Sequence, residues 1–361
     1  MTTLATSRIV NFSAGPSALP LEVLEEAREA LLVLGNSGVG ILEHSHRSKE
    51  FLAVVAEAQA SLRGLLALPD DFAVLFLTGG ASQQFFMVPM NFLKGGVANY
   101  LDTGVWSSKA IKEAKRFGQV HVACTSKDTN YSYIPASADL KPGAAYTHYT
   151  SNNTIYGTQF AAEPPSEGPL VCDASSDFLS RPIDIAKHGL IYAGAQKNLG
   201  PAGVTIVIMR KDFIEAGEKE LPTMLQYRTH LENDSLYNTP PVFAIYVTGL
   251  VLKWLERMGG VAAMQARNEA KAKLVYDALD ASSFYRCPVA KDSRSRMNVV
   301  FRLPSEELEA KMAKDALAAG FSGIKGHRSA GGIRISIYNA IEPSAVESFV
   351  SFMKDFEAKN G

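Results

Sequence analysis

The feature that most constrains the fold of this chain is a regular alternation of apolar and helical segments between residues 72 and 210. Segments with helical spacing lie between several of the apolar runs, such as 107–117, which ends at Gly118. Apolar, β-branched strands separated by helices predict an α/β fold with a mostly parallel sheet covered on both faces. The predicted strands are 72–77, 97–101, 120–123, 170–172, 190–193 and 204–209.

Helical patterns flank this region on both sides. Residues 20–34 begin with proline and are followed by Gly35, the usual order at the two ends of a helix, and 48–66 form a second predicted helix. After Gly259-Gly260 the pattern becomes that of a compact α+β unit, so we expect a large domain over 16–260 and a small domain made of 1–15 and 261–361. The elements predicted for this unit are helix 261–279, strand 297–302, helix 305–319, strand 333–337 and helix 344–356.

Charge and composition argue against several classes of protein. The 361 residues include 36 basic and 37 acidic side chains, so the charge balance does not favour binding to nucleic acid or to an anionic membrane. The three cysteines lack metal-ligand spacing, which predicts a reduced compartment and no metal site. The first eight residues lack a signal-peptide pattern, and the apolar run 242–252 is too short to span a bilayer and predicts a buried helix. We expect a cytoplasmic protein.

Lys197 is the residue that points most clearly to chemistry. It is the only charged residue between His188 and Arg210, and its neighbours are small or apolar, so that burial could lower the pKa of its ammonium group. An amine on such a loop can form a Schiff base with an aldehyde cofactor. Asp173, which ends a predicted strand, could keep a pyridine nitrogen protonated. Alternatively, Lys197 is a solvated surface charge and Asp173 caps a helix.

Two other features suggest that anions bind to this chain. The turn Gly79-Gly80-Ala81-Ser82 joins a strand to a helix, where backbone amides and the helix dipole favour an anion, although such turns are also ordinary connections. Arg334 lies inside the apolar strand 333–337, so its charge requires either an internal salt bridge or a ligand carboxylate.

The remaining candidates leave more alternatives open. Trp106 could belong to the core or form a flat platform for a ring, and Thr154 could be a turn residue or a donor to a ring oxygen. The basic clusters 44–47 and 325–328 are either solvated loops or a joint site for a doubly charged phosphate.

Taken together in chain order, these motifs resemble those of the phosphoserine aminotransferases, in the class V group of fold-type I pyridoxal-phosphate aminotransferases. The resemblance implies that fold, with a mostly parallel mixed sheet in the large domain and a smaller α+β domain at the C-terminus. Ala14 and the pair Ala81-Ser82 depart from the residues of some members, which puts local contacts there in doubt. The matching motifs are Asn11-Phe-Ser-Ala-Gly-Pro-Ser-Ala-Leu-Pro20, His46-Arg47, Gly79-Gly-Ala-Ser82, Thr154-Ile-Tyr-Gly-Thr158, Asp173, Ser175-Ser-Asp-Phe-Leu-Ser-Arg-Pro182, Tyr192-Ala-Gly-Ala-Gln-Lys-Asn198, Tyr237-Asn-Thr-Pro-Pro241 and Ile335-Ser-Ile-Tyr-Asn339.

The resemblance implies pyridoxal 5'-phosphate as the cofactor, joined to Lys197. Asp173 would pair with the pyridine nitrogen, Trp106 would stack on the ring, and Thr154 would reach its 3-oxygen side. The cofactor phosphate would be held by residues of both subunits of a homodimer. These are Ala81, Ser82 and Gln196 of one chain with Asn238 and Thr239 of the other.

The resemblance also implies a reaction, the reversible amino transfer between L-glutamate and 3-phosphohydroxypyruvate that gives 2-oxoglutarate and O-phospho-L-serine. Arg334 would bind the substrate α-carboxylate, and the distal anion would be received by His46, Arg47, His327 and Arg328. This chemistry belongs to serine biosynthesis, and 4-phosphohydroxy-L-threonine of pyridoxine biosynthesis is a further substrate that the resemblance allows.

Three other functions compete with this prediction. An alanine–glyoxylate-type aminotransferase would not need two basic clusters for a distal anion. A cysteine desulfurase needs a nucleophilic cysteine near the site, and the late segment 322–332 contains none. A relative that binds the cofactor without catalysis would share the fold, because fold alone does not imply activity.

Overall fold

The centre of the molecule is a seven-stranded sheet with the order β2-β10-β9-β8-β5-β3-β4. The computed structural model describes residues 8–361. Residues 1–7 lie outside the described residues, and so do the predictions that fall on them, which are most of the segment examined for a signal peptide and the start of the predicted small domain. Strand β10 is antiparallel to both of its neighbours, and the other pairings are parallel, which confirms the predicted mostly parallel α/β sheet. The strands are β2 (Phe72–Leu77), β3 (Val97–Asp102), β4 (Gln119–Thr125), β5 (Thr147–Thr150), β8 (Leu170–Asp173), β9 (His188–Gly194) and β10 (Thr205–Arg210).

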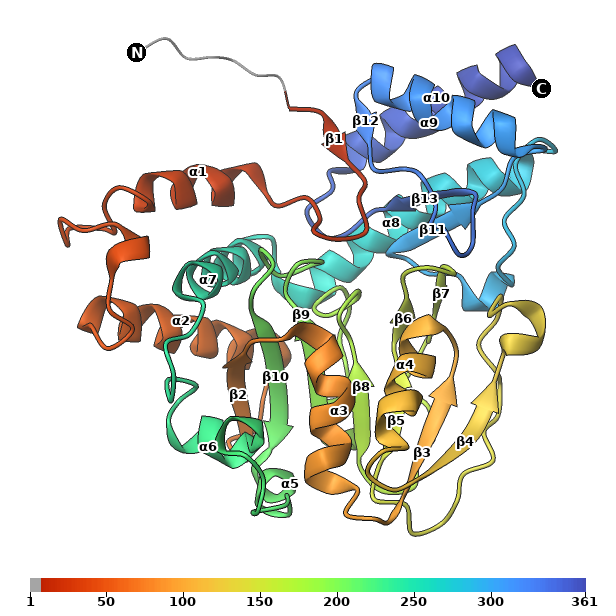
Figure 1. Cartoon of the computed structure of the whole chain (residues 1–361). Helices are drawn as coiled ribbons and strands as arrows, with labels where there is room; N and C mark the ends of the chain where they lie inside the picture. The colour runs from red at the N-terminus through yellow and green to blue at the C-terminus, as the bar shows by residue number, and fades with distance from the viewer. Residues whose placement is uncertain (1–7) are drawn as a thin grey trace.

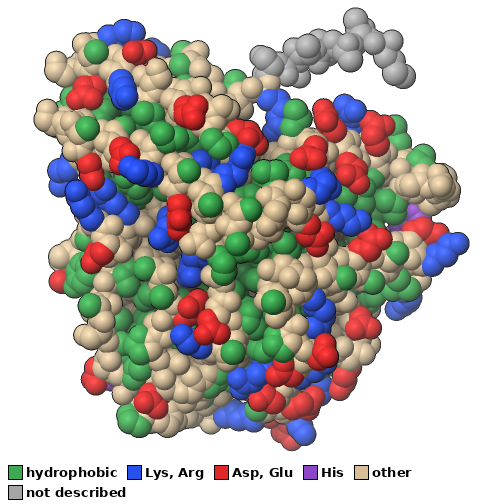
Figure 2. Space-filling model, turned by 180° about the vertical axis from the view of Figure 1, so that it is seen from behind, with side chains coloured by type: hydrophobic (Ala, Val, Ile, Leu, Met, Phe, Trp, Pro, Cys, Tyr) green, Lys and Arg blue, Asp and Glu red, His purple; other side chains and the backbone are tan. Residues whose placement is uncertain are grey.

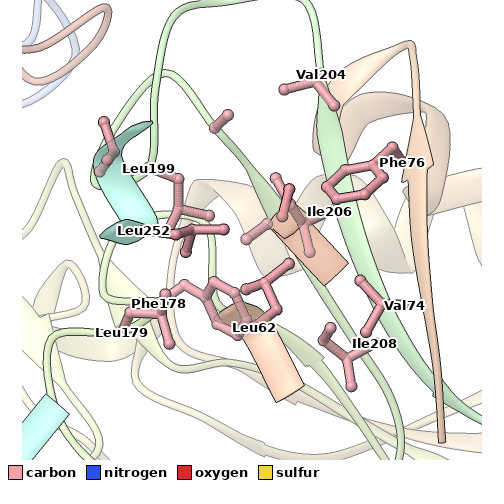
Figure 3. Close-up of a cluster of buried hydrophobic side chains, with 14 of the residues drawn as sticks. Leu62, Val74, Phe76, Phe178, Leu179, Leu199, Val204, Ile206, Ile208 and Leu252 are labelled. Atoms are coloured by element: carbon pink, nitrogen blue, oxygen red, sulfur yellow. The ribbon is translucent and has the colours of Figure 1, made fainter. Parts of the chain in front are cut away.

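Helices cover both faces of this sheet (Figure 1). Because side chains alternate along a strand, Val74 and Phe76 join one apolar cluster while Ala73 and Leu75 join another on the opposite face. Figure 3 shows part of the first cluster, in which Leu62 and Leu252 meet the side chains of the sheet. The first face carries α2 (Lys49–Leu66) and α7 (Val242–Arg257), with α1 (Leu21–Ala30) against α7; the second carries α3 (Gly80–Phe92) and α4 (Val105–Ala114).

Helix α7 contains the apolar run 242–252, and most of its side chains are buried against α1 and α2. Within residues 8–361, no helix combines the length and the apolar character needed to cross a membrane.

Two details of the predicted secondary structure are wrong. Strand β5 lies in the middle of the sheet but was not predicted, because its four residues Thr147–Thr150 are polar or aromatic rather than aliphatic. All four are nevertheless buried. The hydroxyl of Tyr192 lies 2.9 Å from Nε2 of His148, and Oγ1 of Thr147 donates a 3.1 Å hydrogen bond to the carbonyl of Glu167, whereas Oγ1 of Thr150 has no partner among the described residues. Helix α1 ends at Ala30, four residues before the predicted end at residue 34.

The C-terminal third forms a second apolar cluster of its own, centred on residues such as Val299, Ile335 and Phe349. Phe12 belongs to this cluster because β1 pairs in parallel with β12. The predicted strands 297–302 and 333–337 form an antiparallel pair, β11 and β13. The elements of this part are β1 (Val10–Asn11), α8 (Gly260–Ala281), β11 (Asn298–Phe301), α9 (Glu306–Ala318), β12 (Phe321–Ser322), β13 (Ile333–Ser336) and α10 (Pro343–Asn360).

Short elements connect the larger ones. They are the helices α5 (Lys211–Glu215) and α6 (Tyr227–Glu232), the hairpin strands β6 (Asn152–Asn153) and β7 (Thr158–Gln159), and single helical turns at Ile41–Glu43, Lys127–Thr129, Ile185–Lys187, Thr223–Leu225 and Lys291–Ser293.

The direction of the strands fixes where a ligand can bind. Since β2, β3, β5, β8 and β9 run parallel, their carboxyl ends lie at the same edge of the sheet, and Figure 1 shows this edge facing the C-terminal unit. Ligands of open α/β sheets bind at this edge. The residues at or just beyond the ends of these strands include Gly79, Trp106, Thr154, Asp173 and Lys197.

Candidate active site

A cavity of about 450 Å³ lies at the carboxyl edge of the sheet. Its size falls within the range of small-molecule and cofactor sites, roughly 300–1,000 Å³. The side chains that line this cavity come from positions up to about 250 residues apart in the sequence, from Ala81 to Arg334. The sequence-predicted site residues that line the cavity are Ala81, Ser82, Trp106, Thr154, Asp173, Gln196, Lys197, His327 and Arg334.

Lys197 follows β9 on a tight turn and points into this cavity. Its Nζ donates a 3.0 Å hydrogen bond to Oγ1 of Thr154 and lies 5.6 Å from the ring centroid of Trp106. Burial lowers the pKa of the ammonium group below that of an ordinary lysine, and the Asp173 carboxylate opposes this shift. The surface-charge alternative therefore does not hold, because this half-buried amine lines the cavity and is more easily deprotonated than an exposed lysine.

Asp173 ends β8 on the wall of the same cavity. Its Oδ1 accepts a 3.0 Å hydrogen bond from the backbone N–H of Ser175, and no helix follows, so it closes a turn rather than capping a helix. Burial raises the pKa of the carboxyl group, while the Lys197 ammonium and the contacts with Ser175 lower it. No donor among residues 8–361 bonds to the second oxygen, so the carboxylate can accept a hydrogen bond from a ring N–H.

The first turn of α3 provides backbone donors to the cavity. Gly79 has φ +83°, and a Cβ there would lie 2.0 Å from Oε1 of Gln83, so the turn requires glycine. The first backbone bond into the helix is donated by the N–H of Gln83 to the carbonyl of Gly79. The preceding amides, Gly80, Ala81 and Ser82, have no acceptor within the helix and face the cavity, which makes this turn suited to a phosphate.

Trp106 lies in the first turn of α4 and presents its ring to the cavity. The turn before it is fixed by Asp102, whose Oδ1 accepts hydrogen bonds from the hydroxyls of Ser107 (3.2 Å) and Ser108 (2.7 Å). The ring is half-buried, and Nζ of Lys109 lies 4.6 Å from its centroid. The ring packs in part against the apolar cluster of this sheet face and also lines the cavity, so it can serve as the predicted platform.

Arg334 reaches the cavity from β13. Its Nη1 makes only a long, 3.4 Å hydrogen bond to the carbonyl of Thr154, and its buried Nε has no acceptor. Across the described chain, residues 8–361, no carboxylate lies within 4.0 Å of the guanidinium, so the internal salt bridge does not form. Burial lowers the pKa of the guanidinium, and a ligand carboxylate is the partner that this arrangement leaves room for.

Five predicted site residues do not line this cavity. His46 is half-buried and its Nε2 has no partner among the described residues, whereas Arg47 is exposed. Asn238 and Thr239 are exposed in the loop before α7, where Asn238 borders a separate hollow next to Thr78. The fifth, Arg328, follows His327 and is also exposed.

Some residues of the cavity wall were not predicted as site residues. Gly15 has φ +147°, and a Cβ there would lie 3.5 Å from Cγ of Lys197. The same segment is tied to the lysine loop because the N–H of Ser17 donates a 2.9 Å hydrogen bond to the carbonyl of Gln196. The motif at residues 11–20 was the available signal, although it gave no role. The unpredicted wall residues include Gly15, Phe85, Ile155 and Ser175.

Comparisons with known proteins agree with this geometry. Residues 9–349 match the family model described as aminotransferase class-V. A phosphoserine aminotransferase from Desulfosudis oleivorans is 54% identical over 99% of this chain and 100% of that protein. The solved phosphoserine aminotransferase from Bacillus circulans subsp. alkalophilus has a TM-score of 0.96 and 53% identity, covering 98% of this chain and 99% of that one. A PLP-bound phosphoserine aminotransferase from Trichomonas vaginalis has a TM-score of 0.92 and 41% identity, covering 96% and 100%. The chain therefore belongs to the class-V aminotransferase family and, within it, to the phosphoserine aminotransferases.

Proposed function

We infer that this chain is a transaminase that uses pyridoxal 5'-phosphate to move an amino group reversibly between L-glutamate and 3-phosphohydroxypyruvate, with 2-oxoglutarate and O-phospho-L-serine as the other reactants. The single observation that carries the assignment of residues is that one cavity holds the half-buried Lys197 amine, the buried Asp173 carboxylate and the Arg334 guanidinium, which has no carboxylate partner among residues 8–361. A basic nitrogen, an anion for a ring N–H and a receptor for a carboxylate are the groups that such a reaction needs.

The residues of the cavity fit the cofactor. Asp173 has one free oxygen for the ring N–H, Trp106 offers a flat face, and the open amides of Ala81 and Ser82 form an anion site. The Oγ1 of Thr154, which accepts from Lys197 here, can turn its own proton toward a ring oxygen. When bound, the cofactor supplies an aldehyde that condenses with amines and a ring that accepts the electron pair released at the α-carbon.

Lys197 has two tasks in this scheme. Its Nζ would hold the aldehyde cofactor at rest and would be free as an amine once the amino acid substrate is bound. The free amine then removes the α-proton of the amino acid in one half-reaction and restores a proton to the α-carbon in the other. Burial lowers the pKa of Lys197, so a larger fraction of the amine is present as the base at neutral pH than on an exposed lysine.

Arg334 orients both substrates by their common α-carboxylate. Its unpaired guanidinium faces the cavity, and a planar fork of two N–H donors matches a carboxylate. His327 lies on the same wall and is one member of the predicted receptor for the distal anion, either the γ-carboxylate of glutamate or the phosphate of phosphoserine.

A homodimer would give a role to the predicted site residues that do not line the cavity of their own chain. Large apolar side chains that are exposed among residues 8–361 concentrate in one segment, because seven of the eleven lie between Leu21 and Leu52. His46 and Arg47 lie in this same segment, which forms the projecting edge around α1 and the start of α2 (Figures 1 and 2). Exposed apolar side chains mark an interaction surface. We propose that this edge pairs with a second copy, so that His46, Arg47, Asn238 and Thr239 complete the partner's cavity.

Two further predictions remain proposals. The division into a large domain, 16–260, and a small domain, 1–15 with 261–361, is supported by the separate apolar cluster to which Phe12 contributes. A cytoplasmic location is supported by the three cysteines, which are all free.

A spectral titration tests the proposed function. The purified holoprotein should be yellow, and added glutamate should bleach it because the amino group passes to the cofactor. Phosphoserine should bleach it as well, and 3-phosphohydroxypyruvate should restore the colour, whereas alanine should have little effect. A preparation that alanine bleaches as readily as phosphoserine would contradict the assignment of substrates.

A further inference from the structure

The loop of residues 326–332 carries His327 to the wall of the cavity. It is closed on itself, because the N–H of Gly326 donates to the carbonyl of Gly332 at 2.8 Å and the N–H groups of Ala330 and Gly331 donate to the carbonyl of His327. None of its side chains is fully buried. Apolar packing therefore contributes little to the position of this loop, and polar contacts with its surroundings must fix it.

A buried carboxylate on α9, that of Glu309, makes one of these contacts directly and orients the arginine that makes another. The Oε2 of Glu309 accepts a 3.1 Å hydrogen bond from the N–H of Gly332, at the end of the loop. Its Oε1 accepts from Nε of Arg302 at 2.6 Å and from the N–H of Leu303 at 3.3 Å. Only 8% of the Glu309 side chain is exposed, so water competes weakly for these bonds.

Arg302 extends the contact to the middle of the loop. Its Nη1 donates a 2.9 Å hydrogen bond to the carbonyl of Ala330. The loop backbone lies directly against this side chain, since a Cβ added at Gly331 would be 2.9 Å from Nη1 and one at Gly332 would be 2.7 Å from Cδ. Figure 1 shows α9, β11 and β13 together in the C-terminal unit, and the loop lies in the connection between β12 and β13.

We propose that Glu309, acting through Arg302 and Gly332, is a positioning residue that fixes His327 for recognition of the distal anion. The inference rests on the proposed function, because it takes His327 to contact that anion. Glu309 touches neither the cavity nor the reacting atoms, so it would act on substrate binding more than on the chemical step.

The chemistry of the contact shows why a carboxylate is needed. Both oxygens of Glu309 accept from N–H donors, and a glutamine amide has one acceptor and one donor group. In Glu309→Gln, the NH₂ group must therefore face an N–H of either Gly332 or Arg302, and one of the two links is lost. The size of the side chain is unchanged, so this variant perturbs the loop with little change in packing.

The experiment compares Glu309→Gln with Glu309→Ala, His327→Ala and a control, Asp315→Asn, in the holoenzyme. Asp315 lies on the same helix and makes an exposed ion pair with Lys311, so its loss should alter neither readout. The first readout is KM and kcat for phosphoserine. The second is the rate of trypsin cleavage after Lys325 and Arg328, compared with the rate at exposed sites elsewhere in the chain.

For Glu309→Gln we expect KM for phosphoserine to rise roughly tenfold with a smaller change in kcat, as for a displaced binding group. Cleavage in the loop should accelerate about tenfold, as expected from the loss of one hydrogen bond to a charged group, while other sites stay unchanged. Glu309→Ala should give larger effects of the same kind. If Glu309→Ala does not fold, Glu309→Gln alone decides the question.

The outcomes separate this inference from the proposed function. If His327→Ala raises KM but Glu309→Gln leaves KM unchanged, the positioning role is overturned whether or not the loop is cut faster. If cleavage accelerates everywhere in the chain, Glu309 has a general structural role and the inference is again overturned. If His327→Ala itself leaves KM unchanged, the proposed role of His327 in binding the anion is wrong, and the positioning role falls with it.

Discussion

Replacing Arg334 with glutamine should weaken catalysis strongly and change the stability of the folded protein only slightly. The guanidinium has no carboxylate within 4.0 Å in residues 8–361, its Nε has no acceptor, and burial lowers the pKa of the group. Folding thus already encloses an unpaired cation, and only the substrate α-carboxylate completes its hydrogen bonds.

The size of the effect follows from this environment. Removing one member of a desolvated, hydrogen-bonded charge pair costs about 2–5 kcal/mol of binding free energy. Because Arg334 is half-buried, we expect a value of about 3 kcal/mol, which lowers kcat/KM by roughly 100- to 200-fold. The free energy of unfolding of the cofactor-free protein should change by less than about 1 kcal/mol or increase, since no internal ion pair is lost.

Steady-state kinetics with phosphoserine and with glutamate, together with urea unfolding, test this prediction. Both amino acids should lose kcat/KM by a similar factor, because they share the α-carboxylate. Arg286→Gln is a matched control, since Arg286 is also an arginine of the C-terminal unit and is exposed without an ion pair among the described residues. A loss confined to one substrate, or a loss of more than about 2 kcal/mol in stability, would refute the reasoning.

Three further predictions follow from the same geometry. Asp173→Asn should bind the cofactor roughly 10- to 100-fold more weakly, because a hydrogen bond to a charged group is lost; cofactor titration measures this, and unchanged affinity would exclude the pairing. In the cofactor-free protein, the rate of Schiff-base formation at Lys197 should rise with pH as the amine loses its proton. The midpoint of this pH dependence should lie below the ordinary lysine pKa of about 10.4, because burial lowers the pKa of Lys197. A midpoint at or above that value would contradict this prediction. If the proposed homodimer forms through the segment 21–52, Leu32→Glu should dissociate it in sedimentation and lower activity, whereas the same substitution at the exposed Leu317 on α9 should not. A stable, active dimer of the Leu32→Glu variant would contradict the proposed position of the interface.

The sequence predicted most of the large sheet because its strands are buried on both faces. Strands such as Phe72–Leu77 consist of aliphatic and aromatic side chains only, and two-sided burial requires that pattern. Strand β5 has the same burial with polar and aromatic side chains, several of which bond to distant residues, as Tyr149 does with His188 at 2.9 Å. Hydrogen bonds between residues about 40 positions apart cannot be read from local hydrophobicity.

The end of helix α1 shows a different limit. Residues 31–34 continue the apolar, helix-favouring pattern up to Gly35, yet the helix ends at Ala30. Leu31, Leu32 and Val33 are exposed in the single chain. A residue pattern shows that these side chains need a partner, but it does not show whether the partner belongs to the same chain.

The position of the site residues at strand ends could be predicted from local sequence patterns, whereas the position of the other site residues could not. Asp173 and Lys197 follow apolar strands directly, so the position of the strands brings them to one edge of the sheet. The convergence of Arg334 on the same cavity depends on how the C-terminal unit packs, which no local pattern specifies. His46 and Arg47 are placed away from the cavity of their own chain, and their role depends on the proposed second subunit.

Covalent trapping tests the central claim most directly. Holoprotein reduced with borohydride should carry one cofactor label per chain, and digestion followed by mass mapping should place it on Lys197. Lysines that are also buried provide an internal comparison, notably Lys271, whose ammonium is held by three backbone carbonyls. A label on any other lysine, or no label at all, would contradict the account.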